Sequence, residues 1–308
     1  MNAMLLILAY LAIGLVLKRT NALPVNSGQV LNQYVINVAV PAMILLHLPH
    51  LEMGREVLLP AVMPWVLFPI SIGFVLLSSK LLGWDRELTG ALLIVVPLGN
   101  TSFLGFPMVE AFFGSAGLPY AVIYDQVGSF IALAFFATLF AAVYGNRNNQ
   151  QERPTVVSIV KKLLTFPPVL ALVIALLFGM QSYPGVLDTL ITSLAATLVP
   201  VVMIAVGFQL HFRILRADVV PFSIAMVIKL LLLPLLALGI MLSFGWQGLA
   251  AQVTVLEAAM PFMITGGAVA ISAGLKPRLV ASLIGYGVIA GLITVPIWAL
   301  ILHSQLSL

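Results

Sequence analysis

Residues 95–107 read VVPLGNTSFLGFP and interrupt a long hydrophobic segment. The stretch holds two prolines and two glycines, which are the poorest helix formers. It also holds the polar triplet Asn100, Thr101 and Ser102. A helix broken here leaves free C=O groups on one half and free N–H groups on the other. The stretch therefore predicts an interrupted helix whose new end is capped by the polar triplet, with these side chains facing a ligand.

The composition indicates an integral membrane protein. The chain has 308 residues, of which 62% are hydrophobic and 8% are charged, whereas about a quarter of a soluble domain is charged. It contains no cysteine, which excludes disulfides, thiolate metal sites and cysteine catalysis. The net charge of +4 is accounted for by membrane orientation and predicts no nucleic-acid partner.

Ten segments are apolar and about as long as a membrane-spanning helix, which needs about 20 residues. The first has its basic residues after the apolar run and lacks an A-x-A-like cleavage site, so we expect a retained helix, not a signal peptide. The predicted spans are 3–17, 29–49, 57–81, 88–113, 118–144, 158–180, 187–209, 218–243, 248–274 and 279–302.

Loop charges predict the orientation. Of the 14 Lys and Arg residues, all lie near the connections that follow spans 1, 3, 5, 7 and 9, except Arg55 on the other side and Lys229 within span 8. The positive-inside rule places these connections in the cytoplasm and both termini outside. We therefore expect a multi-pass membrane protein, with the lipid bilayer as its surroundings.

The longest polar loop divides the spans into two sets of five. We predict a first repeat over 1–144, a cytoplasmic linker over 145–157 and a second repeat over 158–308. Because five is odd, the second repeat enters the membrane with inverted orientation.

The two repeats share local patterns. Span 2 contains NVAVPAMILL (37–46) and span 7 contains ATLVPVVMIA (196–205), with Pro41 opposite Pro200. Span 9 contains EAAMPFMITGG (257–267), again a proline beside small residues in mid-span.

Interrupted helices at matching positions of inverted repeats are typical of secondary transporters, with the binding site near the bilayer midplane. The N-terminal ends of the half-helices attract an anion and the carbonyl ends attract a cation. Ordinary proline kinks are the alternative explanation. Simple kinks are favoured at Pro64, Pro69, Pro168, Pro234 and Pro296.

Several motifs resemble the auxin efflux carrier family, also called the PIN-like or membrane transport protein family, and most closely its bacterial branch. They are GNTSFLGFPMVEAFFG (99–114), AVIYD (121–125), VPVVMIAVGFQL (199–210) and AAMPFMITGGAVA (258–270). The resemblance covers essentially the whole chain. In span 9, Met260 precedes Pro261 where plant members commonly have Asn.

The resemblance implies an all-α membrane fold of ten helices, a five-plus-five inverted repeat with crossing broken helices 4 and 9, related to bile-acid symporters and sodium/proton antiporters. Spans 3–5 and 8–10 would form a moving transport domain. Spans 1, 2, 6 and 7 would form a scaffold that dimerises. The implied substrates are small organic anions: auxin in plants, and malate or malonate in bacteria.

Ionisable side chains within spans are rare and functional or paired. Asp125 accepts a coupling proton or pins the crossover. Glu257, just before the second break, is a proton carrier or a neutral acid bonded to unwound backbone, because burial disfavours the charged form. Lys229 neutralises one of these acids or attracts an anionic substrate.

The predicted binding residues cluster at the two breaks, with one from the scaffold. Asn37 in span 2 touches substrate or makes a hydrogen bond between helices. No cofactor and no metal site are predicted. The predicted substrate-binding residues are Asn100, Thr101, Ser102, Pro261, Thr265, Asn37 and Gln126, and the coupling or ion-pair candidates are Asp125, Glu257 and Lys229.

Two functional classes other than a transporter fit the sequence poorly. The sequence has no H-E-x-x-H motif, no G-x-S-x-G motif and no paired intramembrane aspartates, which argues against an enzyme. A channel needs a continuous polar path, which mostly apolar spans do not supply. The sequence therefore predicts a transporter. The resemblance implies carboxylates as its substrates, elevator-type alternating access and a location in the bacterial cytoplasmic (inner) membrane. Coupling to protons, coupling to sodium as in the bile-acid symporters, and uniport all stay open.

Overall fold

The computed structural model describes residues 2–51, 54–145, 156–179, 183–210 and 214–306. All regular elements within these ranges are helical, which confirms the all-α prediction. Most of the predicted linker 145–157 lies outside the described residues, as do Arg147, Arg153 and Arg213 of the charge pattern.

The first half of the chain forms helices that are divided by short π-helical and 3-10 turns. Many of these turns adjoin prolines or glycines, which disturb regular helical hydrogen bonding. In chain order the elements are α1 (Asn2–Arg19), α2 (Ser27–Tyr34), η1 (Val35–Ala39), α3 (Val40–His47), η2 (Leu48–His50), η3 (Arg55–Val57), α4 (Leu58–Leu82), α5 (Arg86–Val95), η4 (Thr101–Gly105), α6 (Phe106–Phe113), η5 (Ser115–Gly117), α7 (Leu118–Ile123), η6 (Tyr124–Ser129), α8 (Phe130–Ala132), η7 (Leu133–Ala137) and α9 (Thr138–Tyr144).

The second half follows the same style and ends in the longest helix among the described residues. Its elements are α10 (Val156–Leu164), α11 (Pro167–Phe178), α12 (Gly185–Ala196), α13 (Leu198–Gln209), η8 (Arg216–Asp218), α14 (Val219–Val227), η9 (Ile228–Leu232), α15 (Leu233–Ser243), α16 (Leu249–Ala258), α17 (Ile264–Ser272) and α18 (Pro277–Gln305).

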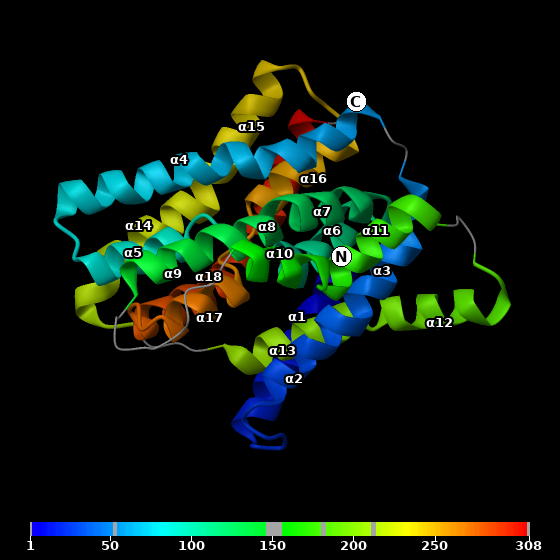
Figure 1. Cartoon of the computed structure of the whole chain (residues 1–308), viewed down its shortest axis with the longest axis horizontal. Coiled ribbons are helices and arrows are strands. Elements are labelled where there is room, and N and C mark those ends of the chain that lie inside the picture. The colour runs from blue at the N-terminus through cyan, green and yellow to red at the C-terminus, as the bar shows by residue number, and fades with distance from the viewer. Residues whose placement is uncertain (1, 52–53, 146–155, 180–182, 211–213, 307–308) are drawn as a thin grey trace.

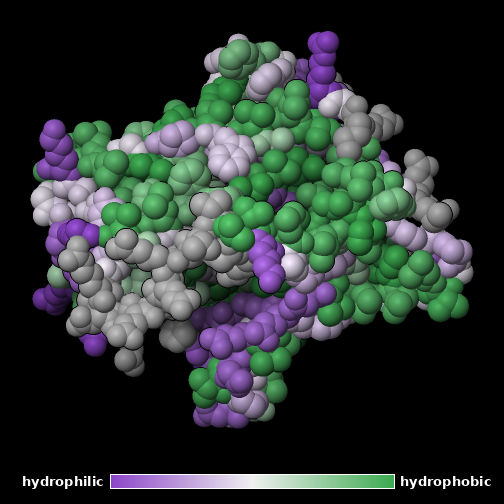
Figure 2. Space-filling view, in the orientation of Figure 1, coloured by the Kyte–Doolittle hydropathy of each residue, from purple (hydrophilic) through white to green (hydrophobic). Residues whose placement is uncertain are grey.

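Six helical stretches are long and apolar enough to cross a membrane. They coincide with predicted spans 2, 3, 5, 7, 8 and 10. The surface is largely hydrophobic, with hydrophilic residues gathered at its margins and in a band over α2 (Figure 2), as expected for a chain surrounded by lipid. The six stretches are Ser27–His50, Arg55–Leu82, Ser115–Tyr144, Gly185–Gln209, Arg216–Ser243 and Pro277–Gln305.

Predicted span 6 is not one helix. The chain leaves the helical conformation between α10 and α11, where Phe166 is extended with ψ 122°. Phe166 precedes Pro167, and a residue before proline is disfavoured in the α conformation because it clashes with the proline ring. The predicted span 158–180 therefore overestimates the continuous helix, and α11 has only 12 residues.

Spans 4 and 9 are interrupted where the sequence predicts. Helix α5 ends at Val95 and helical structure resumes at Thr101. Helix α16 ends at Ala258 and α17 begins at Ile264. The two half-helices α5 and α17 lie together, and α6 lies with α16 on the other side of the break (Figure 1). The two interrupted segments therefore meet at their breaks, and we refer to this meeting point as the crossing.

A second group of helices packs around α13. Helix α1 lies along α13, while α3 contacts α11 and α12. The closest approach depends on two glycines: a Cβ atom at Gly14 would collide with the Ile204 carbonyl, and one at Gly207 would collide with the Leu11 carbonyl. Small residues of this kind let membrane helices pack backbone against backbone.

Charged residues join the starts of α5 and α18. Asp85 accepts a hydrogen bond from the Leu88 N–H at 2.7 Å and so caps α5, and its other oxygen is 2.8 Å from Lys276 Nζ. Glu87 accepts the Lys276 backbone N–H at 2.8 Å. The hydrogen bond from Lys276, followed by that from Leu88, lowers the pKa of Asp85. The contact places the connections that precede α5 and α18 on the same side of the protein.

We expect Asp85→Ala to destabilise the protein by about 1–2 kcal/mol, because a helix cap is lost. Lys276→Met should cost at most about 1 kcal/mol, because the ion pair is largely solvent-exposed while the cap remains. Since the folded-state pKa of Asp85 is lowered, its contribution is present above the unfolded-state pKa and is lost as the pH falls through the folded-state value. Thermal unfolding of both variants between pH 7 and pH 3, at about one-unit steps around the usual carboxyl range, measures this. Equal losses in both variants would contradict the capping role.

Candidate functional site

The two interrupted segments are joined by backbone hydrogen bonds. The Asn100 N–H donates to the Pro261 carbonyl at 2.7 Å, and the Met263 N–H donates to the Leu98 carbonyl at 3.1 Å. Gly99 and Phe262 form an isolated antiparallel bridge between them. These bonds satisfy backbone groups that the breaks would otherwise leave unpaired inside the membrane. The crossing of spans 4 and 9 is thus a short piece of β-structure between four half-helices.

Asp125 anchors the start of η4. Its carboxylate accepts a hydrogen bond from the Thr101 hydroxyl, one from the Ser102 hydroxyl at 2.6 Å and one from the Gln126 amide at 2.7 Å. The side chain is 1% exposed. Because the hydrogens of both hydroxyls are directed to Asp125, Thr101 and Ser102 face any substrate as acceptors in this conformation. The geometry favours the pinning role that the sequence left open for Asp125.

Asn100 combines two functions at the break. Its backbone carbonyl accepts from Leu104 and Gly105, at 3.2 and 3.0 Å, and so starts the new helical segment. Its side chain is 2% exposed, and its amide nitrogen has no hydrogen-bond partner. A buried donor without a partner is costly, so this group is available for a ligand.

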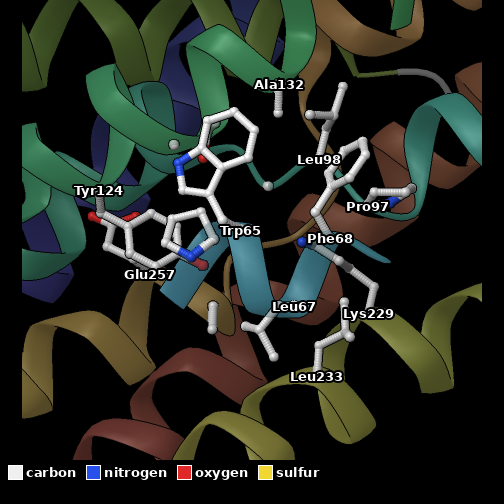
Figure 3. Close-up of a pocket in the computed structure, with 15 residues that line it drawn as sticks. Trp65, Leu67, Phe68, Pro97, Leu98, Tyr124, Ala132, Lys229, Leu233 and Glu257 are labelled. Atoms are coloured by element: carbon white, nitrogen blue, oxygen red, sulfur yellow. The ribbon is translucent and has the colours of Figure 1, made fainter. Parts of the chain in front are cut away.

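Glu257 and Lys229 line one small cavity on the other face of the crossing. They enter it from different helices, with Trp65 and Phe68 of α4 and Tyr124 of η6 around them (Figure 3). The cavity volume is about 20 Å³, which is room for one water molecule and not for an organic acid. Both carboxylate oxygens of Glu257 lack a hydrogen-bond partner, although the residue is 0% exposed.

The remaining predicted residues are placed differently from one another. Gln126 is buried beside Asp125, and its carbonyl oxygen has no partner. Pro261 acts through its backbone carbonyl, and its ring approaches Gly291 of α18. Thr265 is exposed on the first turn of α17. Asn37 is exposed on η1, where its amide donates to the Gln33 carbonyl at 2.7 Å, and it does not line the crossover cavity.

The sequence analysis did not single out several residues that shape the crossing. A side chain at position 105 would collide with the Glu257 carboxylate, so Gly105 lets this carboxylate approach the η4 backbone. Tyr124 and Trp65 line the cavity. In the sequence, Gly105 could have been found from its place in the G-F-P motif after the polar triplet, and Tyr124 from its place beside Asp125. Nothing in the sequence of α4 distinguishes Trp65. Within the described ranges, no three His, Asp or Glu side chains gather as a metal site.

Two larger cavities flank the crossing. One of about 450 Å³ lies between α1, α3, α12 and α6, and touches Pro107 and Glu110. The other, of about 510 Å³, lies between α2, α13, α17 and α18 and touches Ile264 and Ala268. Each cavity therefore reaches one half-helix of an interrupted span. The first reaches α6 from the predicted outer side, and the second reaches α17 from the predicted cytoplasmic side.

An all-helical, multi-pass chain with two interrupted helices crossing inside it is organised as a membrane transporter, and the comparisons with known proteins agree. A family model described as membrane transport protein matches residues 1–299. An uncharacterized transporter of Methanothermobacter thermautotrophicus is 30% identical over 98% of both chains. An uncharacterized transporter of Methanocaldococcus jannaschii is 26% identical, again over 98% of both chains. The chain belongs to the membrane transport protein family, which confirms the resemblance seen in its motifs.

We expect Asp125→Ala to be the most damaging single truncation at the crossing. It leaves two hydroxyls and one amide without their acceptor in a buried site, at a cost of about 3–5 kcal/mol. Glu56→Ala, on an exposed 3-10 turn, is the control and should change stability by less than about 0.5 kcal/mol. Thermal unfolding in detergent distinguishes them. A stable Asp125→Ala protein would show that this carboxylate does not hold the crossing together.

Proposed function

We propose that the protein is a secondary transporter of small organic anions, with its substrate site at the crossing of the interrupted helices. The observation that carries this proposal is the buried, unpartnered amide nitrogen of Asn100 at the start of η4. Helix N-terminal ends carry partial positive charge and free N–H groups, which suit a carboxylate. The amide of Asn100 adds a side-chain donor to that field.

The two flanking cavities support alternating access. Their volumes of about 450 and 510 Å³ lie within the usual range for small-molecule sites, roughly 300–1,000 Å³. Both separate the helices assigned to the scaffold from those assigned to the transport domain, and Asn100 lines neither of them. An elevator-type movement of the crossing past α13 would open the site first to one cavity and then to the other.

The inverted repeat is part of the same proposal. Helices α5 and α16 each have 10 residues, and each is followed by a five-residue break, 96–100 and 259–263. Equal half-helices and breaks in the two halves are what duplication of one unit produces. The fold proposed is thus two five-span repeats, 1–144 and 158–308, in a cytoplasmic membrane.

The scaffold helices α2 and η1 expose polar side chains that need polar partners within the membrane. Gln29, Gln33 and Asn37 are exposed at four-residue spacing along α2 and η1. Figure 2 shows a hydrophilic band over this part of the molecule. Polar side chains at membrane depth need polar neighbours or water. The predicted homodimer through the scaffold helices would provide polar neighbours from the second copy. A sodium-coupled symporter of the bile-acid type is the competing proposal, because the unpartnered oxygens of Gln126 and Glu257 resemble free cation ligands.

The first test is a thermal-shift screen of purified protein against mono- and dicarboxylates, aromatic acids and amino acids, with Asn100→Ala beside the wild type. Loss of a hydrogen bond to a charged ligand, about 1.5–3 kcal/mol, should weaken carboxylate binding about 10- to 100-fold. Ser193→Ala is the control, because that hydroxyl is exposed and bonds only its own helix, to Leu190. Identical carboxylate responses in wild type and Asn100→Ala would contradict the proposed site.

A further inference from the structure

Lys229 is the only buried basic side chain among the described residues. It lies in η9, where α14 passes into α15, and is 3% exposed. An isolated ammonium in a membrane interior is expensive, and such residues persist where they have a partner or a function. The groups that surround the ammonium therefore indicate the function of Lys229.

The ammonium lies where two helix C-terminal ends meet. A Cβ atom at Gly99 would be 3.2 Å from Lys229 Nζ and 3.7 Å from the Glu257 carbonyl oxygen, so both groups border the same side of Gly99. Pro97, Leu98 and Ala258, which follow or end α5 and α16, line the same cavity as Lys229. Helix C-terminal ends carry free carbonyls and partial negative charge. The ammonium sits at the joint negative end of both half-helices.

Glu257 adds a further acidic group to this place. Both of its carboxylate oxygens lack partners, and the cavity between it and Lys229 has room for one water molecule or small ion. Over the described ranges, the only ion pair within 4.0 Å joins Asp85 and Lys276. Lys229 and Glu257 line the same cavity without direct ion-pair contact. Opposite charges buried this way attract each other over a longer distance, and mobile ions screen them little.

We propose that the Lys229 ammonium is a tethered cation that takes the place of a coupling ion at the crossing. Carbonyl ends and an acidic side chain are the groups that hold sodium or a proton in transporters with interrupted helices. Here a cation attached to the chain already neutralises them, and it would repel a second one. The protein therefore has no requirement for sodium. The consequence for transport rests on the proposed function, whereas the electrostatic role of Lys229 does not.

The test is thermal unfolding of the purified full chain in sodium chloride and in N-methylglucamine chloride at equal ionic strength. The wild type should have the same Tm in both salts. Lys229→Met should lower the Tm in N-methylglucamine chloride by on the order of 5–10 °C, and sodium or methylammonium should restore most of that loss. Lys80→Met, which removes an exposed lysine near the end of α4, is the matched control and should not respond to the cation.

Two results would overturn the proposal: a wild-type protein that sodium stabilises, or a Lys229→Met protein that is equally destabilised in every cation. Should Lys229→Met yield no folded protein, the double variant Lys229→Met/Glu257→Gln decides, since removing the uncompensated acid should recover folded protein. Failure to recover it contradicts the proposal. None of these measurements contains a substrate, so a negative carboxylate screen would refute the proposed function and leave this inference standing.

Discussion

A peptide group inside a bilayer has no water to bond, so each break in a membrane helix must be compensated by other protein groups. Here the two breaks compensate each other through the bonds Asn100 to Pro261 and Met263 to Leu98. The remaining features of the crossing depend on this exchange. It fixes the directions of four half-helix ends, and therefore fixes where positive and negative ends of the helix dipoles accumulate.

The buried charges are distributed according to those ends. Asp125 lies near the N-terminal end of η4, where its carboxylate accepts hydrogen bonds from the hydroxyls of Thr101 and Ser102. Lys229 lies at the C-terminal side, near the Glu257 carbonyl. Asp125 and Lys229 thus lie at opposite ends of the half-helix dipoles. That separation explains why the polar residues of spans 4, 5, 8 and 9 converge while the spans themselves stay apolar.

The breaks were predictable because proline, glycine and hydrogen-bonding side chains have a local effect on the helix that carries them. The partners of those side chains were not, because they depend on how distant helices rotate against each other. Asn37 illustrates this: composition marks it as unusual, but only packing decides that it faces outwards on η1. The prediction of one continuous helix over span 6 was wrong for a different reason. Hydropathy counts apolar residues and does not register that Pro167 forces Phe166 out of the helical conformation.

The close approach of Gly14 and Gly207 to backbone carbonyls has a bearing on biogenesis. Helix α1 is made before its main partner α13, and the bond from Lys18 to the Leu210 carbonyl spans 192 residues. Gly14 of α1 therefore remains without its partner in the lipid while the five predicted spans that separate the two helices, spans 2 to 6, are made.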